Sequence, residues 1–242
     1  MYSEIFRRSE FLIGAAGLEK LSRSTVAVFG LGGVGSYATE ALARAGLGAL
    51  VIVDYDIVDI TNINRQLHAL KSTLGRPKTE LMTLRLQEIN PVLNIRALQL
   101  KFSPETAAEI FDGSNIDFII DAIDDVENKV ALIAESVSRG LSIVSAMGAG
   151  NKLNPTAFKV ASIWKTNVCP LARVMRKKLR AAGINNDIPV VYSTECPRPT
   201  AILNQGEKQV PGSISFVPPV AGLILAAFVV DKLLSLDIFT DM

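Results

Sequence analysis

The sequence predicts an α/β protein with a Rossmann-like, mostly parallel, doubly wound sheet and added antiparallel strands in the C-terminal half. Short apolar segments rich in β-branched residues alternate with amphipathic helical segments up to about residue 150, which is the pattern of repeated βα units. A glycine-rich stretch directly follows the first apolar segment. Beyond residue 150, apolar and polar residues alternate as in an antiparallel strand.

Length and composition are those of one large globular domain. The 242 residues, 49% of them hydrophobic, suffice for a sizeable core. The net charge of +1 argues against a generally basic nucleic-acid binder, so any RNA site has to be a local patch. Because no charged-then-apolar leader precedes the first strand, we expect a cytoplasmic protein.

The first half is predicted to open with a helix over residues 2–21 and then to alternate strands and helices. The strands are expected at residues 25–29, 50–53, 92–100, 116–120 and 142–147, of which 25–29 and 116–120 read as buried and 92–100 alternates. The helices between them are expected at residues 37–45, 77–90 and 127–138, with a further helix that starts at Ser103 as N-cap and Pro104 as first helical residue.

The second half departs from the βα repeat. We expect an antiparallel strand at residues 156–164, an amphipathic helix at 169–183, a strand at 188–193 and a long mobile loop at about 194–212.

The C-terminal segment from residue 214 to 230 is apolar but short for a membrane span, which needs about 20 residues. Pro218 and Pro219 instead predict the start of a buried helix, 219–236, that packs on the sheet. Peripheral membrane contact is the alternative.

The glycine-rich stretch after the first strand predicts a nucleotide-binding loop. Gly30 allows the tight turn, Gly32 and Gly33 let the backbone approach a phosphate, and Gly35 lets the helix pack on the sheet. The positive end of the helix dipole faces that phosphate. Asp54, at the end of the next strand, can accept hydrogen bonds from ribose hydroxyls. This pattern predicts an adenine nucleotide without distinguishing NAD from ATP.

Cations that follow the second strand favour ATP. Arg65 belongs to Asn-x-Asn-Arg-Gln (62–66), and Lys78 ends Gly-Arg-Pro-Lys (75–78). A dehydrogenase needs neither cation here, whereas a leaving pyrophosphate is stabilised by both. Lys78 is also unfavourable for the dipole at a helix N-terminus, which indicates a phosphate between the lysine and the helix end. Ordinary solvated charges are the alternative interpretation.

Acidic residues end the strand at 116–120. Asp121, Asp124 and Asp125 stand at the carboxyl end of a parallel strand, where open α/β sheets bind ligands. Carboxylate oxygens are the ligands that Mg²⁺ prefers. A helix N-cap with acids in the first turn is a second interpretation, compatible with the first.

These motifs together resemble those of the ThiF/MoeB adenylating enzymes, relatives of the ubiquitin-activating enzymes. The shared residues are the glycine loop, Asp54-x-Asp56, Asn62-x-Asn64-Arg65-Gln66, Lys78 and Asp121-x-x-Asp124. The resemblance covers nearly the whole chain. Residues 6–10, 63–70 and 190–193 look most like the bacterial subfamily that acts on threonylcarbamoyladenosine in tRNA.

The resemblance implies ATP-dependent adenylation of the threonylcarbamoyladenosine carboxylate and cyclising dehydration. The carboxylate attacks the α-phosphorus, pyrophosphate leaves, and a nitrogen of the same side chain closes a five-membered ring and expels AMP. This chemistry needs charge neutralisation and positioning more than a protein nucleophile. The alternatives are adenylation of the C-terminal glycine of a ubiquitin-like sulfur carrier, and an NAD-binding or non-enzymatic Rossmann protein.

The resemblance also assigns residue roles. Catalysis falls to Arg65, Lys78, Asp124 and Arg8, where Arg8 reaches the nucleotide of the partner subunit in a homodimer or is a surface arginine. Asp124 is expected to hold Mg²⁺ with ATP. The expected ATP-binding residues are Gly30, Gly32, Gly33, Gly35, Asp54, Asp56, Asn62, Asn64, Arg65, Gln66, Lys78, Asp124 and Asp125.

The expected organisation is a single adenylating domain, 1–242. It comprises an N-terminal helical segment (1–24), a nucleotide-binding half (25–150) and a substrate and dimer half (151–242). The two cysteines are too few for the zinc site that several relatives carry, so we expect no zinc. A monovalent cation (Na⁺ or K⁺) and a sulfur-transfer or redox partner protein are left open.

The predicted helix at 169–183 carries the one dense basic run of the sequence, which could hold the tRNA backbone. A solvated face, with cations favoured towards the helix C-terminus, is the alternative. The basic residues are Arg173, Arg176, Lys177, Lys178 and Arg180.

Three further residues are not expected to perform chemistry on sequence grounds. His68, flanked by apolar residues, is expected to be structural. Cys169 stands where similar sequences usually have an aspartate, which leaves its role open. Cys196 lies in the region where ubiquitin-activating relatives carry a thioester cysteine, and we expect a bystander.

Overall fold

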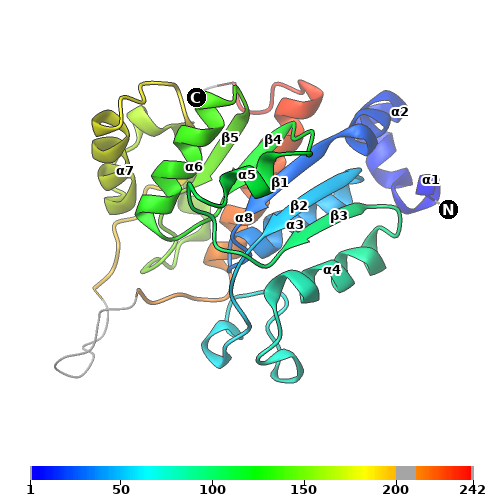
Figure 1. Ribbon diagram of the computed structural model, residues 1–242, viewed down its shortest axis with the longest axis horizontal. Coiled ribbons are helices and arrows are strands. Elements are labelled where there is room, and N and C mark those ends of the chain that lie inside the picture. Colours follow the sequence, from blue (N-terminus) through cyan, green and yellow to red (C-terminus); the bar gives the residue numbers. More distant parts are fainter. Residues whose placement is uncertain (1, 200–210, 241–242) are drawn as a thin grey trace.

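The structure, a computed structural model, describes residues 2–199 and 211–240. These residues form a seven-stranded sheet with helices on both faces (Figure 1). The predicted mobile loop at about 194–212 falls mostly on residues 200–210, outside the described residues.

The sheet has the strand order β3-β2-β1-β4-β5-β7-β6. Its strands are β1 (Thr25–Phe29), β2 (Ala49–Val53), β3 (Asn94–Leu98), β4 (Phe118–Asp121), β5 (Ser142–Ala146), β6 (Phe158–Ser162) and β7 (Pro189–Ser193). The pairings from β3 through to β7 are parallel, and β6 runs antiparallel to β7. The predicted mostly parallel sheet with antiparallel pairing in the C-terminal half is confirmed.

Helices cover both faces of the sheet. The α-helices of the described residues are α1 (Tyr2–Ile5), α2 (Arg7–Arg23), α3 (Gly35–Ala45), α4 (Lys78–Ile89), α5 (Ala107–Phe111), α6 (Val126–Ser138), α7 (Pro170–Ala181) and α8 (Val217–Leu234). Side chains of α3, α4 and α8 share one apolar core with the sheet, and those of α5, α6 and α7 share the other. In Figure 1, α5 and α6 lie in front of the sheet, with α3 and α8 behind it.

The long apolar helix α8 belongs to the protein core. Its length and apolar character suffice for a membrane span, but 56% of that window is buried inside the molecule. Phe228 packs edge-on against Phe118 of β4, with ring centroids 6.2 Å apart. The prediction of a buried helix on the sheet is confirmed, although α8 starts two residues earlier than expected and carries Pro218 and Pro219 in its first turn.

Two predicted helices differ in the structure. The N-terminal helix is divided into α1 and α2, and α2 is itself interrupted at Gly14, which has φ 71°. The predicted helix start at Ser103 and Pro104 is wrong, since α5 begins at Ala107. The Ser103 amide donates to Thr106 Oγ1 at 2.9 Å, so these residues close a local turn that competes with the helix.

The strand order creates a crevice at the carboxyl edge of the sheet. From β1 the chain moves outwards through β2 to β3, and then returns to place β4 on the other side of β1. The loops after β1 and β4 therefore leave in opposite directions, which is the position where doubly wound sheets bind ligands.

Candidate functional site

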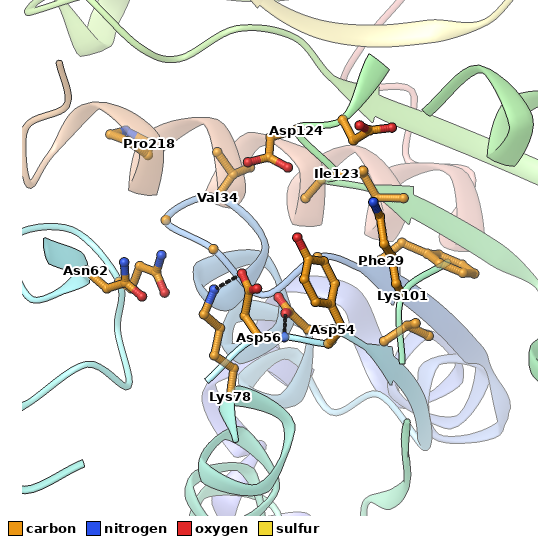
Figure 2. Close-up of a pocket in the computed structure, with 18 of the residues that line it drawn as sticks. Phe29, Val34, Asp54, Asp56, Asn62, Lys78, Lys101, Ile123, Asp124 and Pro218 are labelled. Atoms are coloured by element: carbon orange, nitrogen blue, oxygen red, sulfur yellow. Dashed lines mark hydrogen bonds and ion pairs between the residues drawn. The ribbon is translucent and has the colours of Figure 1, made fainter. Parts of the chain in front are cut away.

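A cavity of about 670 Å³ occupies this crevice. Figure 2 shows side chains from separate loops facing it, among them Asp54, Asp56, Lys78 and Asp124. The predicted residues that line the cavity are Gly30, Gly32, Gly33, Asp54, Asp56, Asn62, Arg65, Gln66, Lys78, Asp124 and Asp125. Of the predicted ATP-binding residues, Gly35 and Asn64 are not among the lining residues.

The glycines of the loop differ in what a Cβ atom would meet at each position. Gly30 has φ 88°, and a Cβ there would lie 2.7 Å from the Ala122 carbonyl oxygen of the loop after β4. A Cβ on Gly35 would lie 1.8 Å from the Gly30 carbonyl oxygen, so Gly35 closes the turn itself. A Cβ on Gly32 would have Gln66 Nε2 as its nearest neighbour, 4.0 Å away. Gly32 therefore leaves space on the cavity side, where a ligand can approach the backbone.

Asp54 joins the glycine loop to the end of β2. Its Oδ2 accepts from the Leu31 amide at 2.6 Å and its Oδ1 from the Asp56 amide at 2.8 Å. Burial raises the pKa of the Asp54 carboxyl above its ordinary value, while Lys78 and the two amides act in the opposite direction. A carboxylate has about four acceptor positions, so Asp54 retains capacity for a ribose hydroxyl.

Lys78 and Asp56 form an ion pair at the cavity wall. Lys78 Nζ lies 2.7 Å from Asp56 Oδ2, and the Lys78 amide donates to the Asp56 carbonyl at 3.1 Å (Figure 2). Lys78 is the first residue of α4. Asp56 thus supplies the negative charge that offsets the unfavourable lysine at this helix N-terminus.

Arg65 is held by its own loop. Its Nη1 donates to the Thr61 carbonyl and to Asn64 Oδ1, both at 2.9 Å. Asn64 Nδ2 in turn donates to the Ser213 carbonyl at 2.9 Å. Asn64, predicted to bind the nucleotide, therefore tethers the segment before α8 and orients Arg65.

Gln66 presents an unsatisfied polar atom at the cavity wall. Its Oε1 is buried and has no hydrogen-bond partner among the described residues. Buried acceptors are normally paired, so the Gln66 Oε1 atom is one of a few exceptions among the described residues.

His68 is buried and is not among the residues that line the cavity. Both its ring nitrogens lack hydrogen-bond partners within the described part of the chain. Burial, followed by the charges of Lys78 and Arg85, lowers the pKa of His68 to about 4. The imidazole is therefore neutral at pH 7.

The acids at the end of β4 and in the loop after it have three different environments. Asp121 is fully buried and pairs with Lys129 at 2.9 Å. Asp125 caps α6, because its Oδ1 accepts from the Asn128 amide at 2.8 Å. Asp124 is exposed at the cavity, and Figure 2 shows its side chain beside Val34 of the glycine loop. No cluster of three metal-ligating residues occurs within 2–199 and 211–240, but Mg²⁺ bound with a nucleotide needs only one or two carboxylates beside the phosphates.

Five polar residues of the cavity lining were not among the predicted site residues: Tyr55, Asp59, Lys101, Asn128 and Ser213. Tyr55 and Lys101 line the cavity near Phe102, and Lys101 Nζ lies 5.7 Å from the centroid of the Tyr55 ring. Tyr55 lies two residues after the end of β2, and Lys101 lies three residues after the end of β3. That placement at the carboxyl edge was the available signal.

Most of the basic residues on α7 have intramolecular partners. Arg176 donates to the Thr166 carbonyl at 3.1 Å, Lys178 pairs with Glu127, and Arg180 lies 5.1 Å from the centroid of the Trp164 ring. The side chains of Arg173 and Lys177 are exposed, and neither side chain makes a hydrogen bond or ion pair with the described residues.

The remaining predicted residues lie away from the cavity lining. Arg8 is exposed on α2. Cys169 is buried directly before α7, and Cys196 is exposed. None of the three contributes a lining atom to the cavity of this chain.

Comparison with known proteins places the chain in a family. The sequence profile of the ThiF family matches residues 6–238. The chain is 46% identical to the tRNA threonylcarbamoyladenosine dehydratase of Bacillus subtilis (strain 168), over 95% of this chain and 94% of that protein. It is 38% identical to the Escherichia coli (strain K12) protein of the same name, over 76% of this chain and 71% of that one.

A solved structure has the same fold over almost the whole chain. The crystal structure of the E. coli tRNA N6-threonylcarbamoyladenosine dehydratase TcdA in complex with ATP superimposes with a TM-score of 0.88. The match has 32% sequence identity and covers 96% of this chain and 95% of that one. With the glycine loop, the cations and the acids gathered at one cavity, these similarities establish that the chain belongs to the ThiF family of adenylating proteins.

Proposed function

We propose that this protein adenylates the carboxylate of threonylcarbamoyladenosine in tRNA with ATP and then cyclises it with net loss of water. The observation that carries the proposal is the cavity. It combines the glycine loop before α3, the cations Arg65 and Lys78, and the acid Asp124. Bacterial relatives with 46% and 38% identity bear the name of this activity.

The cavity has an apolar end that suits a purine and a charged end that suits phosphates. Tyr55, Phe102 and Ile123 line the apolar end, beyond Asp54. With the ribose at Asp54, the phosphates extend over Gly32 and towards Arg65 and Lys78. This orientation matches the positive end of the α3 dipole with the negative end of the nucleotide.

Arg65 and Lys78 act on the leaving group. When the substrate carboxylate attacks the α-phosphorus, the bond to pyrophosphate breaks and its oxygens gain charge. A guanidinium and an ammonium fixed beside the cavity stabilise that charge without reorganising in the reaction. The acyl-adenylate then loses AMP as a nitrogen of the same side chain attacks the activated carbonyl carbon, so no enzyme nucleophile is needed.

Asp124 is the proposed magnesium-side acid. It is exposed at the cavity and makes no hydrogen bond or ion pair with the described residues, so its carboxylate oxygens are available. Bound Mg²⁺ supplies charge neutralisation between phosphate oxygens. Asp125 is committed to capping α6 and supports the loop.

We also propose binding partners and a cellular location for the protein. The tRNA contacts are assigned to the exposed cations of α7, Arg173 and Lys177. A homodimer brings Arg8 to the partner's cavity, and the protein acts in the cytoplasm. A monovalent cation and a sulfur-transfer or redox partner are compatible additions.

ATP consumption with two tRNA samples tests the function. One tRNA carries the threonylcarbamoyl group and the other lacks it, and the nucleosides are analysed by mass. We expect AMP and pyrophosphate only with the modified tRNA, together with the loss of one water from its nucleoside. Turnover with a carrier protein ending in Gly-Gly, but not with either tRNA, would shift the substrate to a sulfur carrier. Binding of NAD in preference to ATP would refute adenylation altogether.

A further inference from the structure

A fully buried ion pair lies directly beneath the loop that carries Asp124. Asp121 is the last residue of β4, Lys129 lies in the first turns of α6, and neither side chain is exposed at all. Lys129 Nζ lies 2.9 Å from Asp121 Oδ2. Ser145, opposite Asp121 on β5, donates its hydroxyl to the same oxygen at 2.7 Å.

The side chains of Lys129 and Asp121 also form hydrogen bonds with the backbone of residues 121–123. Lys129 Nζ donates to the Ile123 carbonyl at 3.0 Å, and Asp121 Oδ1 accepts from the Ile123 amide at 3.1 Å. Both polar groups of the peptide backbone immediately before Asp124 are thus held by the pair. On the other side of Asp124, Asp125 is fixed as the cap of α6.

The same loop also supports the nucleotide-binding glycines. The Ala122 amide donates to the Phe29 carbonyl at 2.8 Å, and a Cβ on Gly30 would meet the Ala122 carbonyl oxygen. The distance between the glycine loop and Asp124 is therefore set through residues 122 and 123. Burying two charges is costly, and a hydrophobic pair of similar volume often gives equal or greater stability, so a buried ion pair is weak evidence for a purely stabilising role.

We propose that Lys129 and Asp121 are positioning residues for Asp124, which set the place of its carboxylate relative to the phosphates and Mg²⁺; this rests on the proposed function. Groups behind a metal ligand orient it, and their loss costs about 10- to 100-fold in metal affinity. The pair acts through the loop and touches no reacting atom.

The test is the Mg²⁺ dependence of ATP binding, measured by titration calorimetry with the full chain and a non-hydrolysable ATP analogue. The double variant Lys129→Met/Asp121→Asn removes both charges and leaves no buried ion unpaired. We define the Mg²⁺ requirement as the Mg²⁺ concentration that gives half of the maximal increase in analogue affinity. We expect a folded protein in which this concentration rises about tenfold or more. Analogue binding without Mg²⁺ should be unchanged. Asp124→Asn should give the same rise, and combining it with the double variant should add little.

A matched control separates positioning from stability. Leu132→Ala, on the same helix and equally buried, should lower the thermal midpoint and leave the Mg²⁺ requirement unchanged. If the double variant does not fold, Ser145→Ala removes only one hydroxyl of the network, and it should raise the Mg²⁺ requirement in the same direction.

The outcomes distinguish this inference from the proposed function. A wild-type protein that binds no ATP, with or without Mg²⁺, would refute the proposed function. A wild-type protein that binds ATP would refute only the positioning role if Mg²⁺ does not change its affinity, or if a folded double variant or Ser145→Ala variant has an unchanged Mg²⁺ requirement.

Discussion

Lys78 Nζ lies 2.7 Å from Asp56 Oδ2, yet the two side chains have very different surroundings: that of Lys78 is 5% exposed and that of Asp56 is 44% exposed. The carboxylate can turn into solvent, whereas the ammonium stays at the cavity wall. Asp56 therefore neutralises the buried Lys78 ammonium. An incoming phosphate can take the place of the Asp56 carboxylate beside it.

Lys78→Met should weaken ATP binding more than AMP binding, because the ammonium is proposed to contact the outer phosphates. A hydrogen bond to a charged group contributes about 1.5–3 kcal/mol, so we expect about a 10- to 100-fold loss for ATP. Calorimetric titration with both nucleotides measures it. Lys71→Met, which alters an exposed lysine nearby, is the control, and equal losses for ATP and AMP would contradict the assignment.

Arg65→Ala should abolish pyrophosphate release while the fold survives. Among the described residues, the guanidinium hydrogen-bonds to Thr61 and Asn64 of its own loop, whereas a well-placed arginine is worth on the order of 10³ to 10⁵ in phosphoryl transfer. Pyrophosphate release and the thermal midpoint are the measurements. Arg76→Ala removes a half-exposed arginine paired with Glu80 and should be nearly silent. A folded Arg65→Ala protein with a near-normal rate would exclude the role.

Two glycine substitutions should affect different properties. Gly35→Ala should lower stability, whereas Gly32→Ala should lower ATP binding. Gly35→Ala forces a methyl group against the Gly30 carbonyl oxygen, and we expect a loss of about 2 kcal/mol or more in stability. Gly32→Ala has room, so stability should change by less than about 0.5 kcal/mol. ATP binding should nevertheless fall, because the methyl group occupies space beside the loop. Denaturant titration and ATP binding test both, and unchanged binding in Gly32→Ala would place the phosphates elsewhere.

His68 should make stability depend on pH. Its pKa of about 4 in the folded protein lies below the ordinary 6.5. Above pH 6.5 it is neutral in both states. As the pH falls from 6.5 to 4, the unfolded chain takes up the proton first, so about 3 kcal/mol of stability is lost.

The variant His68→Leu isolates this effect, since the chain has a single histidine. The difference between the wild-type and variant unfolding free energies should be constant above pH 6.5 and change steadily between pH 6.5 and 4. Parallel curves across that range would show that the imidazole is not desolvated in the folded protein.

Arg173→Ala/Lys177→Ala on α7 should weaken tRNA binding without loss of stability, because both side chains are exposed. The slope of log affinity against log salt should fall by about 1 to 2. Lys20→Ala/Arg23→Ala, which removes exposed cations from the end of α2, is the control. An unchanged salt slope would identify the α7 face as a solvated helix surface.

The sequence alone was sufficient to predict the sheet and to name many of the residues that line the cavity. Strands, helices and glycine turns follow from local periodicity and from steric rules that act within a few residues. Residues at the carboxyl ends of parallel strands gather at one edge once the strands pair, so the sequence predicts that Asp54 and Asp124 lie at the same edge, and both line the cavity. The false helix start at Ser103 arose where two local patterns, a cap and a turn, share the same residue types.

The tertiary structure decided what depends on partners distant in sequence. Asn64 meets the Ser213 carbonyl, 149 positions away, and so orients Arg65 without lining the cavity. Three cations of α7 interact with residues outside that helix, and Lys129 lies in a fully buried ion pair with Asp121. Residue type and spacing specify which groups are available, but only the packing of distant segments determines which charges are satisfied inside the protein and which remain free for a ligand.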